Sequence, residues 1–175
     1  MKRNFRLLAA LAILLAPAAH AQETWASADK TISFTFPAGW ESVDGTDYAL
    51  FYGVYEDGEM TANCFAEGVI FDTKAGQTQA GYNAFIAAKT PASLDQETPP
   101  ERFTVSRQVS GVTILEYAYE QADDGWPLDF SVMQFGLVRG GTTTGISFTC
   151  VGPQPMSARA TRDIAQIMSS LQIKP

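Results

Sequence analysis

The pairing of strand-length segments across short turns constrains the fold of this 175-residue chain more than any other feature. Two such turns, Ser110-Gly111 and Arg139-Gly140-Gly141, are typical of β-hairpins, in which neighbouring strands run antiparallel. Parallel strands need long crossover connections instead, so the pattern favours an antiparallel sheet over a doubly wound parallel one. The turns separate segments rich in β-branched and aromatic residues at 103–109, 112–119, 128–138 and 142–151.

The first half of the chain predicts further strands. Strict alternation over Thr31–Phe36 places Ile32, Phe34 and Phe36 on one face of a strand, and an extended segment restarts at Trp40 after Pro37-Ala38-Gly39. Segments 48–55 and 62–71 flank the turn sequence Glu56-Asp57-Gly58-Glu59. The sheet is therefore expected to contain about six to seven strands.

Two segments have the periodicity of helices instead. Tyr82, Phe85 and Ile86 recur at helical spacing within 78–89, and Ser157 is a candidate N-cap for a helix over 157–171. Strands and two main helices together predict an α+β fold, an antiparallel sheet sandwiched between helices. We expect one domain over residues 22–175, because neither half has a complete set of packing partners.

Residues 1–21 have the pattern of a secretory signal peptide. Lys2, Arg3 and Arg6 precede an apolar run over 7–16, and Ala19-His20-Ala21 is a small-x-small cleavage site. Cleavage after Ala21 predicts a protein that is exported to the periplasm or secreted. No later apolar segment is long enough to span a bilayer, so stable membrane insertion is not expected after cleavage.

Removal of residues 1–21 changes both the charge and the chemistry of the chain. Nine basic and nineteen acidic residues remain, a net charge of −10, which disfavours nucleic acid as a partner. The single histidine, His20, is lost, and with it the residue on which most general-base and zinc chemistry depends. No metal site and no cofactor are predicted, and the expected partner is an envelope protein or a small ligand.

Two cysteines, Cys64 and Cys150, remain in the mature chain. An even number of cysteines in an oxidising compartment indicates disulfide bonding, and two allow a single intramolecular pairing. Both lie on expected core-facing sides of strands. We therefore predict a structural Cys64–Cys150 disulfide.

The order of elements and two local patterns resemble the Mog1/PsbP-like family. The patterns are the strand, turn and strand of Ile32-Ser33-Phe34-Thr35-Phe36-Pro37-Ala38-Gly39-Trp40 and the terminal helix that closes in Ile167-Met168-Ser169-Ser170-Leu171. The resemblance implies an antiparallel sheet between helices, and a role in binding or assembly more often than in catalysis. It implies no catalytic residues, because the family has no general catalytic motif.

Aromatic and acidic residues are the candidates for a binding surface. Tyrosine and tryptophan suit interfaces because they combine apolar area with a polar group. The candidate binding residues are Tyr48, Tyr52, Asp123, Asp124 and Trp126, with 123–127 as an exposed loop. The same aromatic residues are also compatible with an ordinary core, and the protein with a purely structural envelope role.

A carboxylate-dependent hydrolase acting on envelope glycan is the alternative function. Such chemistry needs two carboxyl groups and no histidine. Glu67 and Glu116 are the candidates, because each lies in mid-strand among apolar neighbours that would raise its pKa. The competing interpretation is that each glutamate is exposed or paired with an arginine. The leading hypothesis remains a non-enzymatic binding protein.

Overall fold

The computed structural model describes residues 22–44, 48–54, 60–72, 77–94 and 100–174. These residues form two α-helices, α1 (Gln79–Ala87) and α2 (Ala158–Ser169), and a short 3₁₀ helix, η1 (Pro91–Ser93). They also form the strands β1 (Glu23–Ala26), β2 (Ile32–Phe36), β3 (Trp40–Asp44), β4 (Tyr48–Val54), β5 (Met60–Asp72), β6 (Arg102–Val109), β7 (Val112–Asp123), β8 (Trp126–Arg139), β9 (Thr142–Pro153) and β10 (Gln172–Ile173).

The strands form two sheets. The large sheet has seven strands in the order β3-β4-β5-β9-β8-β7-β6, and every neighbouring pair is antiparallel. The small sheet, in the order β1-β2-β10, joins the start of the described chain to its end. The α+β fold, an antiparallel sheet with two main helices, is therefore confirmed. The small second sheet was not predicted.

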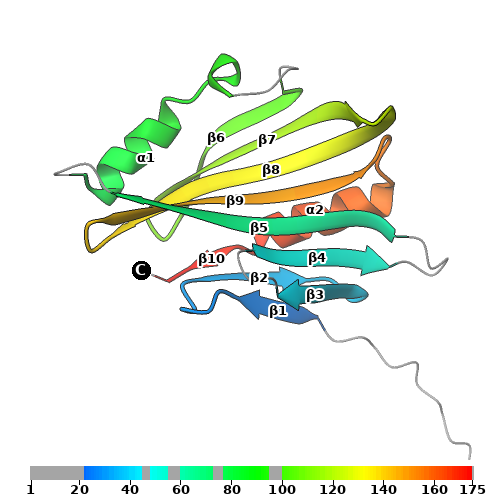
Figure 1. The fold of residues 1–175 in the computed structure, drawn as a ribbon, viewed down its shortest axis with the longest axis horizontal. Coiled ribbons are helices and arrows are strands. Elements are labelled where there is room, and N and C mark those ends of the chain that lie inside the picture. Colours follow the sequence, from blue (N-terminus) through cyan, green and yellow to red (C-terminus); the bar gives the residue numbers. More distant parts are fainter. Residues whose placement is uncertain (1–21, 45–47, 55–59, 73–76, 95–99, 175) are drawn as a thin grey trace, which may run out of the picture.

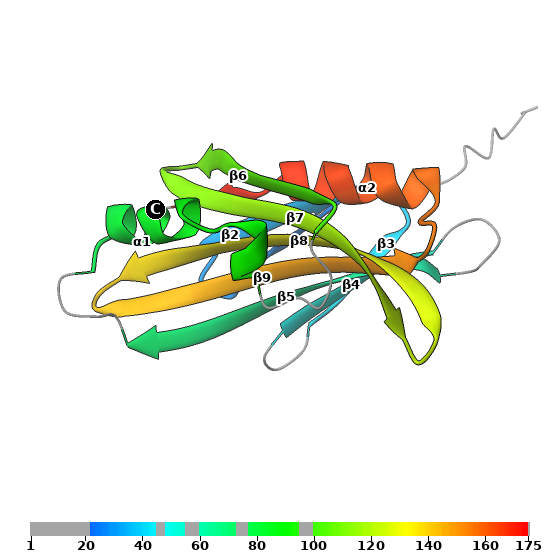
Figure 2. The same ribbon diagram turned by 90° about the horizontal axis from the view of Figure 1, so that it is seen from above.

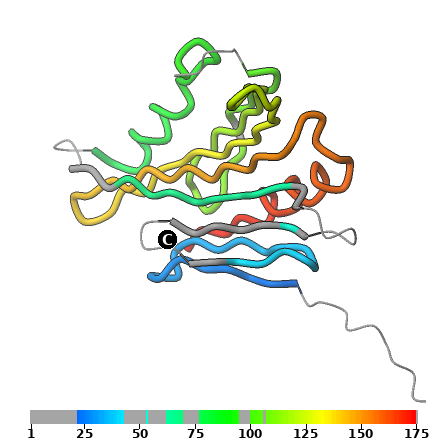
Figure 3. The backbone as a smooth tube through the Cα atoms, turned by 45° about the vertical axis from the view of Figure 1, so that its right-hand side comes forward, coloured from blue at the N-terminus to red at the C-terminus, as the bar shows by residue number. Residues whose placement is uncertain are grey.

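The two helices lie on opposite sides of the large sheet. Figure 1 shows α1 above the sheet, with α2 and the small sheet below it, and Figure 3 shows the same tiers from another direction. The main core fills the lower side, where Phe34 and Phe36 of β2 meet Phe148 of β9 and Ile164 and Ile167 of α2. A smaller cluster on the upper side contains Ile86 of α1 and three residues of β7 and β8, Leu115, Tyr117 and Val132.

Both helices begin where the sequence provides an N-cap. The Thr78 hydroxyl accepts a hydrogen bond from the Gly81 N–H, and the Ser157 hydroxyl accepts one from the Ala160 N–H. Each bond satisfies one of the donors that the first turn of a helix leaves free. The buried residues of α2, Ala160, Ile164 and Ile167, follow the predicted apolar stripe.

Two amide side chains of α1 complete the large sheet where β7 and β8 separate. The β7–β8 pairing ends at Leu115 and Gln134, although both strands continue. The Gln79 side chain bonds the Gly136 carbonyl and the Val138 N–H beyond this point, and the Asn83 side chain bonds the Gly111 carbonyl and the Thr113 N–H. Helix α1 therefore supplies bonds that a neighbouring strand would otherwise make.

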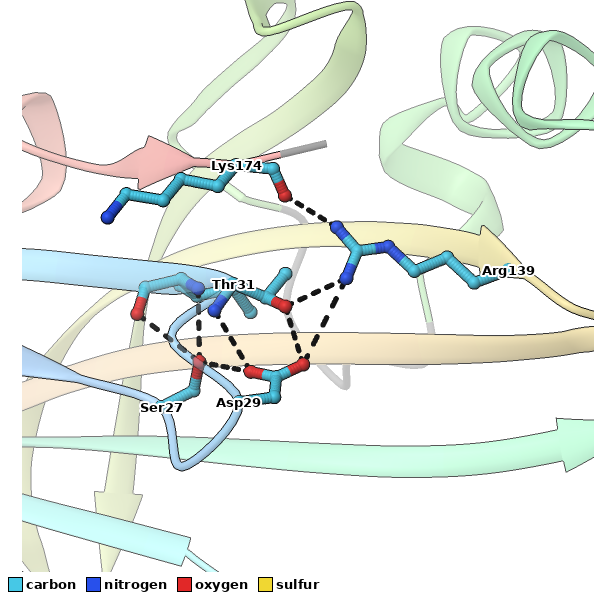
Figure 4. Close-up of polar contacts among 6 residues, drawn as sticks. Ser27, Asp29, Thr31, Arg139 and Lys174 are labelled. Carbon is cyan, nitrogen blue, oxygen red and sulfur yellow. Dashed lines mark hydrogen bonds and ion pairs between the residues drawn. The ribbon is translucent and has the colours of Figure 1, made fainter.

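A polar cluster fastens the small sheet to the end of β8 (Figure 4). The Arg139 guanidinium donates to the Thr31 hydroxyl, at 2.8 Å, and to the Lys174 carbonyl. Asp29 accepts from the Thr31 and Ser27 hydroxyls and from the Thr31 N–H. These bonds, the Thr31 hydroxyl foremost, lower the pKa of Asp29 to about 2.

The predicted Cys64–Cys150 disulfide is present in the core. The two residues are directly opposite on the adjacent strands β5 and β9, and both are fully buried. The bond closes a loop across 86 residues of sequence and ties the two halves of the large sheet together.

Candidate functional site: the open face of the large sheet

The strand register assigns each residue of the large sheet to one of its two faces. Side chains of directly opposed residues lie on the same face, and successive residues along a strand alternate between faces. Met133 and Phe148 are opposed and belong to the lower core with α2. Tyr117 and Val132 are opposed and pack on α1, which fixes the upper face.

Helix α1 covers part of this upper face, against the β7–β8 side of the sheet. Gly136 of β8 is its close contact, because any side chain there would overlap the ring of Tyr82. Beyond α1 the upper face carries further apolar side chains that are half-buried or exposed, and we call six of them the open face. They are Phe65, Val69, Tyr119, Trp126, Leu128 and Phe130.

The exposed large apolar residues of the described chain belong to this side of the molecule. Trp126 is 75% exposed and Val69 is 65% exposed, both on the open face, and Phe85 of α1 is 52% exposed. Single exposed apolar residues are common on any protein surface, and Val69 lies at the register of Gly136, ten residues along β8 from Trp126, so these two residues do not form one patch.

Stacked rings form the floor of the open face. The rings of Tyr119 and Phe130, which are opposed on β7 and β8, stack with centroids 4.8 Å apart, and Tyr117 stacks on Tyr119 at 6.0 Å. Partial burial raises the pKa of the Tyr119 hydroxyl. The Gln134 amide donates to the Tyr117 hydroxyl. The floor is therefore a rigid aromatic surface rather than a set of mobile side chains.

A tight turn presents the acidic end of this surface. Asp124 and Gly125 both have positive φ, 48° and 83°, as the central residues of a two-residue hairpin turn require. The turn places Asp123 opposite Trp126, so a carboxylate accompanies the exposed indole on the open face. The predicted loop over 123–127 is instead a two-residue turn between long strands. Figure 1 shows this hairpin at the end of the sheet away from α1.

The structure brings together only part of the predicted binding set. Asp123, Asp124 and Trp126 are all exposed at the β7–β8 turn. Tyr48 and Tyr52 lie on β4, opposite Glu67 and Asn63 of β5, but their side chains are outside the described residues. Tyr119, Leu128 and Phe130 were not among the predicted site residues. The alternation of Trp126, Leu128 and Phe130 along one strand is the sequence signal that identifies Leu128 and Phe130.

Glu67 and Glu116 are not brought together. Glu67 lies in a row with Ser147, Gln134 and Leu115 on the upper face, whereas Glu116 lies in the next row, with Met133, on the lower face. Glu116 is paired there with Arg107, at 2.9 Å. A glycosidase needs both carboxyl groups beside one bond, so these two residues do not form such a pair.

No three metal-ligating side chains gather among the residues that the structure describes. In the same part of the chain, no helix is long and apolar enough to cross a membrane. The open face offers aromatic contact area and carboxylates.

No family model matches the chain, and no curated protein matches its sequence. Solved structures do match its fold. LpqN of Mycobacterium tuberculosis, described as involved in cell envelope biogenesis, is 10% identical, with a TM-score of 0.58 over 89% of this chain and 91% of LpqN. A Bacteroides thetaiotaomicron protein is 15% identical, with a TM-score of 0.52.

The match to the Bacteroides protein covers 87% of this chain and 48% of that one, so this chain spans about half its length. The Ran-binding protein Mog1p of Saccharomyces cerevisiae is 9% identical, with a TM-score of 0.48 over 88% of this chain and 96% of Mog1p. These identities show similarity of fold alone. At that level the prediction is confirmed: the chain shares the fold of LpqN, and its antiparallel sheet with a helix on each face is the arrangement expected of a Mog1/PsbP-like fold.

Proposed function

We propose that this chain is an exported, non-enzymatic protein that binds a basic partner protein through its open face. The observation that carries the proposal is Trp126, which is 75% exposed beside Asp123 at the end of a stacked aromatic surface. Contact between the apolar indole ring and water is unfavourable. Tryptophan is also one of the residues that contribute most to the binding free energy of protein interfaces.

Charge determines the kind of partner. Within the described parts of β5, β7, β8 and β9, the register places Glu67 and Asp123 on the upper face and no lysine or arginine. Asp124 adds a third carboxylate at the turn. A partner with lysine or arginine side chains would pair with these carboxylates and could also stack a cation on Trp126.

Export is supported by two independent features. The first 21 residues have the signal-peptide pattern, and the Cys64–Cys150 disulfide suits an oxidising compartment. The envelope role stated for LpqN, a protein of the same fold, agrees with this location. We infer that the mature chain starts at Gln22 in the periplasm or outside the cell.

Site-specific photo-crosslinking in the native cell tests the proposal. A photo-reactive amino acid replaces Trp126 or Leu128 on the open face and, as a control, the exposed Arg162 of α2. We expect one crosslinked polypeptide from positions 126 and 128 and none from 162. Raising the salt concentration during crosslinking in cell extract should weaken the product, because attraction between exposed charges is screened.

Two results would count against the proposal. Equal crosslinking from position 162 would mean that contact is non-specific, and no product from either open-face position would mean that this face is free in the cell. Neither result bears on the fold or on the location of the protein, so both test the binding surface alone.

A further inference from the structure

The lower face of the large sheet contains a groove that the proposed partner surface does not use. Two adjoining cavities, of about 280 and about 200 Å³, lie between α2 and the strands β6, β7 and β8. They share five lining residues and so form one groove. The shared residues are Arg102, Ala118, Ser131, Ala165 and Met168.

Small side chains keep the groove open. Ala118 of β7 and Ser131 of β8 are directly opposed on the sheet, and Ala165 lines the helix side. Helices normally pack on sheets through larger apolar side chains that fill such a space. The lower core does so elsewhere along α2, where Ile164 and Ile167 are buried.

An arginine connects the sheet to the helix at one end of the groove. The Arg107 guanidinium donates to the Met168 carbonyl, at 2.9 Å, and forms an ion pair with Glu116. Met168 lies in the last turn of α2, where carbonyl groups lack helical partners and a cation is favourable. This contact bridges the helix and the sheet beside the groove.

The charges that line the groove are separated along its length. Arg102 is opposed to Ala118 on the sheet, and its side chain has no hydrogen bond or ion pair within the described part of the chain. Glu120 and Asp129, which are directly opposed to each other, lie two residues further along β7 and β8, about 7 Å away. The Asp129 carboxylate accepts a hydrogen bond from the Met156 N–H, at 2.8 Å, but like charges in opposed positions are unfavourable, so a cation between the two carboxylates would be stabilising.

We propose that this groove binds a short dipolar ligand, a molecule with a carboxylate at one end and an ammonium group at the other. The carboxylate pairs with the guanidinium of Arg102, the ammonium group lies between Glu120 and Asp129, and an apolar body fills the space beside Ala118, Ala165 and Met168. An ω-amino acid or a dipeptide with free ends has this pattern of charge. The site lies on the opposite face of the sheet from Trp126.

Titrations followed by amide chemical shifts test the assignment with three probes of equal length. The probes are 6-aminohexanoate, which has both charges, hexanoate, which has the anion, and hexylamine, which has the cation. We expect saturable shifts at Ala118, Ser131 and Ala165 with 6-aminohexanoate, and weaker binding of the other two probes. A Kd in the millimolar range is expected for so small a ligand, roughly −4 kcal/mol of binding free energy.

Matched variants distinguish effects at the groove from effects elsewhere on helix α2. Arg102→Gln should weaken binding of 6-aminohexanoate about tenfold, because a charge-assisted hydrogen bond is lost. Ala165→Leu should abolish binding by filling the groove. Arg162→Gln and Gln166→Leu place the same new side chains at exposed positions of α2 that do not line the groove, and should leave the Kd within about twofold of the native value.

Three results would overturn the proposal. Absence of saturable shifts would show that the groove takes no such ligand. Equal affinity for all three probes would show that the charged side chains of the groove do not distinguish between ligands. Native affinity in both Arg102→Gln and Ala165→Leu would show that binding occurs elsewhere.

Discussion

Individual polar side chains connect the layers of this protein by hydrogen bonds at points where the backbone hydrogen bonds between strands end. Arg139 joins β8 to the residues just before β2 and just after β10, and Arg107 joins β6 to the last turn of α2. Trp40 adds a third connection, since its indole N–H donates to Asp163 of α2. Each contact links elements that are distant in sequence, so these residues determine how the layers are positioned.

Asp29 gives the fold a defined response to acid. Its pKa falls from 3.8 to about 2 on folding, so the folded protein binds fewer protons than the unfolded chain between those values. The stability that Asp29 contributes is therefore fully present above about pH 4 and is lost as the pH falls towards 2. Asp29→Asn should cost about 1 kcal/mol of unfolding free energy at pH 7, since the site is largely exposed.

Urea unfolding of native protein and Asp29→Asn at a series of pH values measures this effect. The difference between the two should shrink as the pH falls from 4 to 2. Asp123→Asn changes an exposed aspartate outside the cluster and serves as the control. A difference that stays constant over this range would show that the Asp29 carboxylate is not the titrating group.

At the scale of elements, alternation and turn residues predict the strands of the large sheet closely. The burial of β2, in which Ile32, Phe34 and Phe36 are buried and the residues between them are not, is the alternation that the sequence predicts. The assignment of β2 to a separate sheet could not be predicted, because alternation is the same in either sheet. Strands β1 and β10 have four and two residues, too few for a periodic pattern.

The predicted and observed sites differ for a similar reason. The sequence Asp123-Asp124-Gly125 predicts a turn, and a turn places the neighbouring Trp126 at the surface. The pairing of Arg107 with Glu116 depends on a register shift between Val105 and Arg107 on β6, which no periodicity in the sequence reports. Side chains that meet across strands become visible only when the register is known.

Helix α1 should depend on its amide side chains more than on apolar packing. Ile86 is its only buried residue, whereas Gln79 and Asn83 together make four bonds to the backbone of the sheet and its turn. Asn83→Ala leaves the N–H of the buried Thr113 without its partner, so we expect a loss of about 1–3 kcal/mol.

The free energy of unfolding of Asn83→Ala, measured with urea, tests this dependence. Gln166→Ala removes an exposed amide of α2 and should change stability by less than about 0.5 kcal/mol. If the two variants were equally stable, the anchoring role of Asn83 would be refuted.

At the scale of the whole molecule, the disulfide connects the first and second halves of the large sheet. It closes a loop of 86 residues, and the chain-entropy relation gives roughly 4–5 kcal/mol of stabilisation for a loop of this length. The double substitution Cys64→Ala, Cys150→Ala should therefore lower the free energy of unfolding by several kcal/mol. A reducing agent should destabilise the native protein similarly and leave the double variant unchanged.

The two faces of the large sheet give the molecule two different surfaces. The upper face presents aromatic rings and carboxylates around Trp126, and the lower face contains the groove beside α2. Figure 2, viewed from above, shows the β7–β8 hairpin extending beyond both helices. A partner on Trp126 can therefore approach without displacing either helix.

Native mass spectrometry of the protein released gently from its own cell envelope tests the central claim most directly. The account predicts a complex with one basic polypeptide, present for the native chain and lost in Trp126→Ala, while Arg162→Ala, which changes an exposed residue of α2 on the other side of the sheet, keeps it. A bare monomer for the native chain, or a complex that survives Trp126→Ala unchanged, would contradict the account.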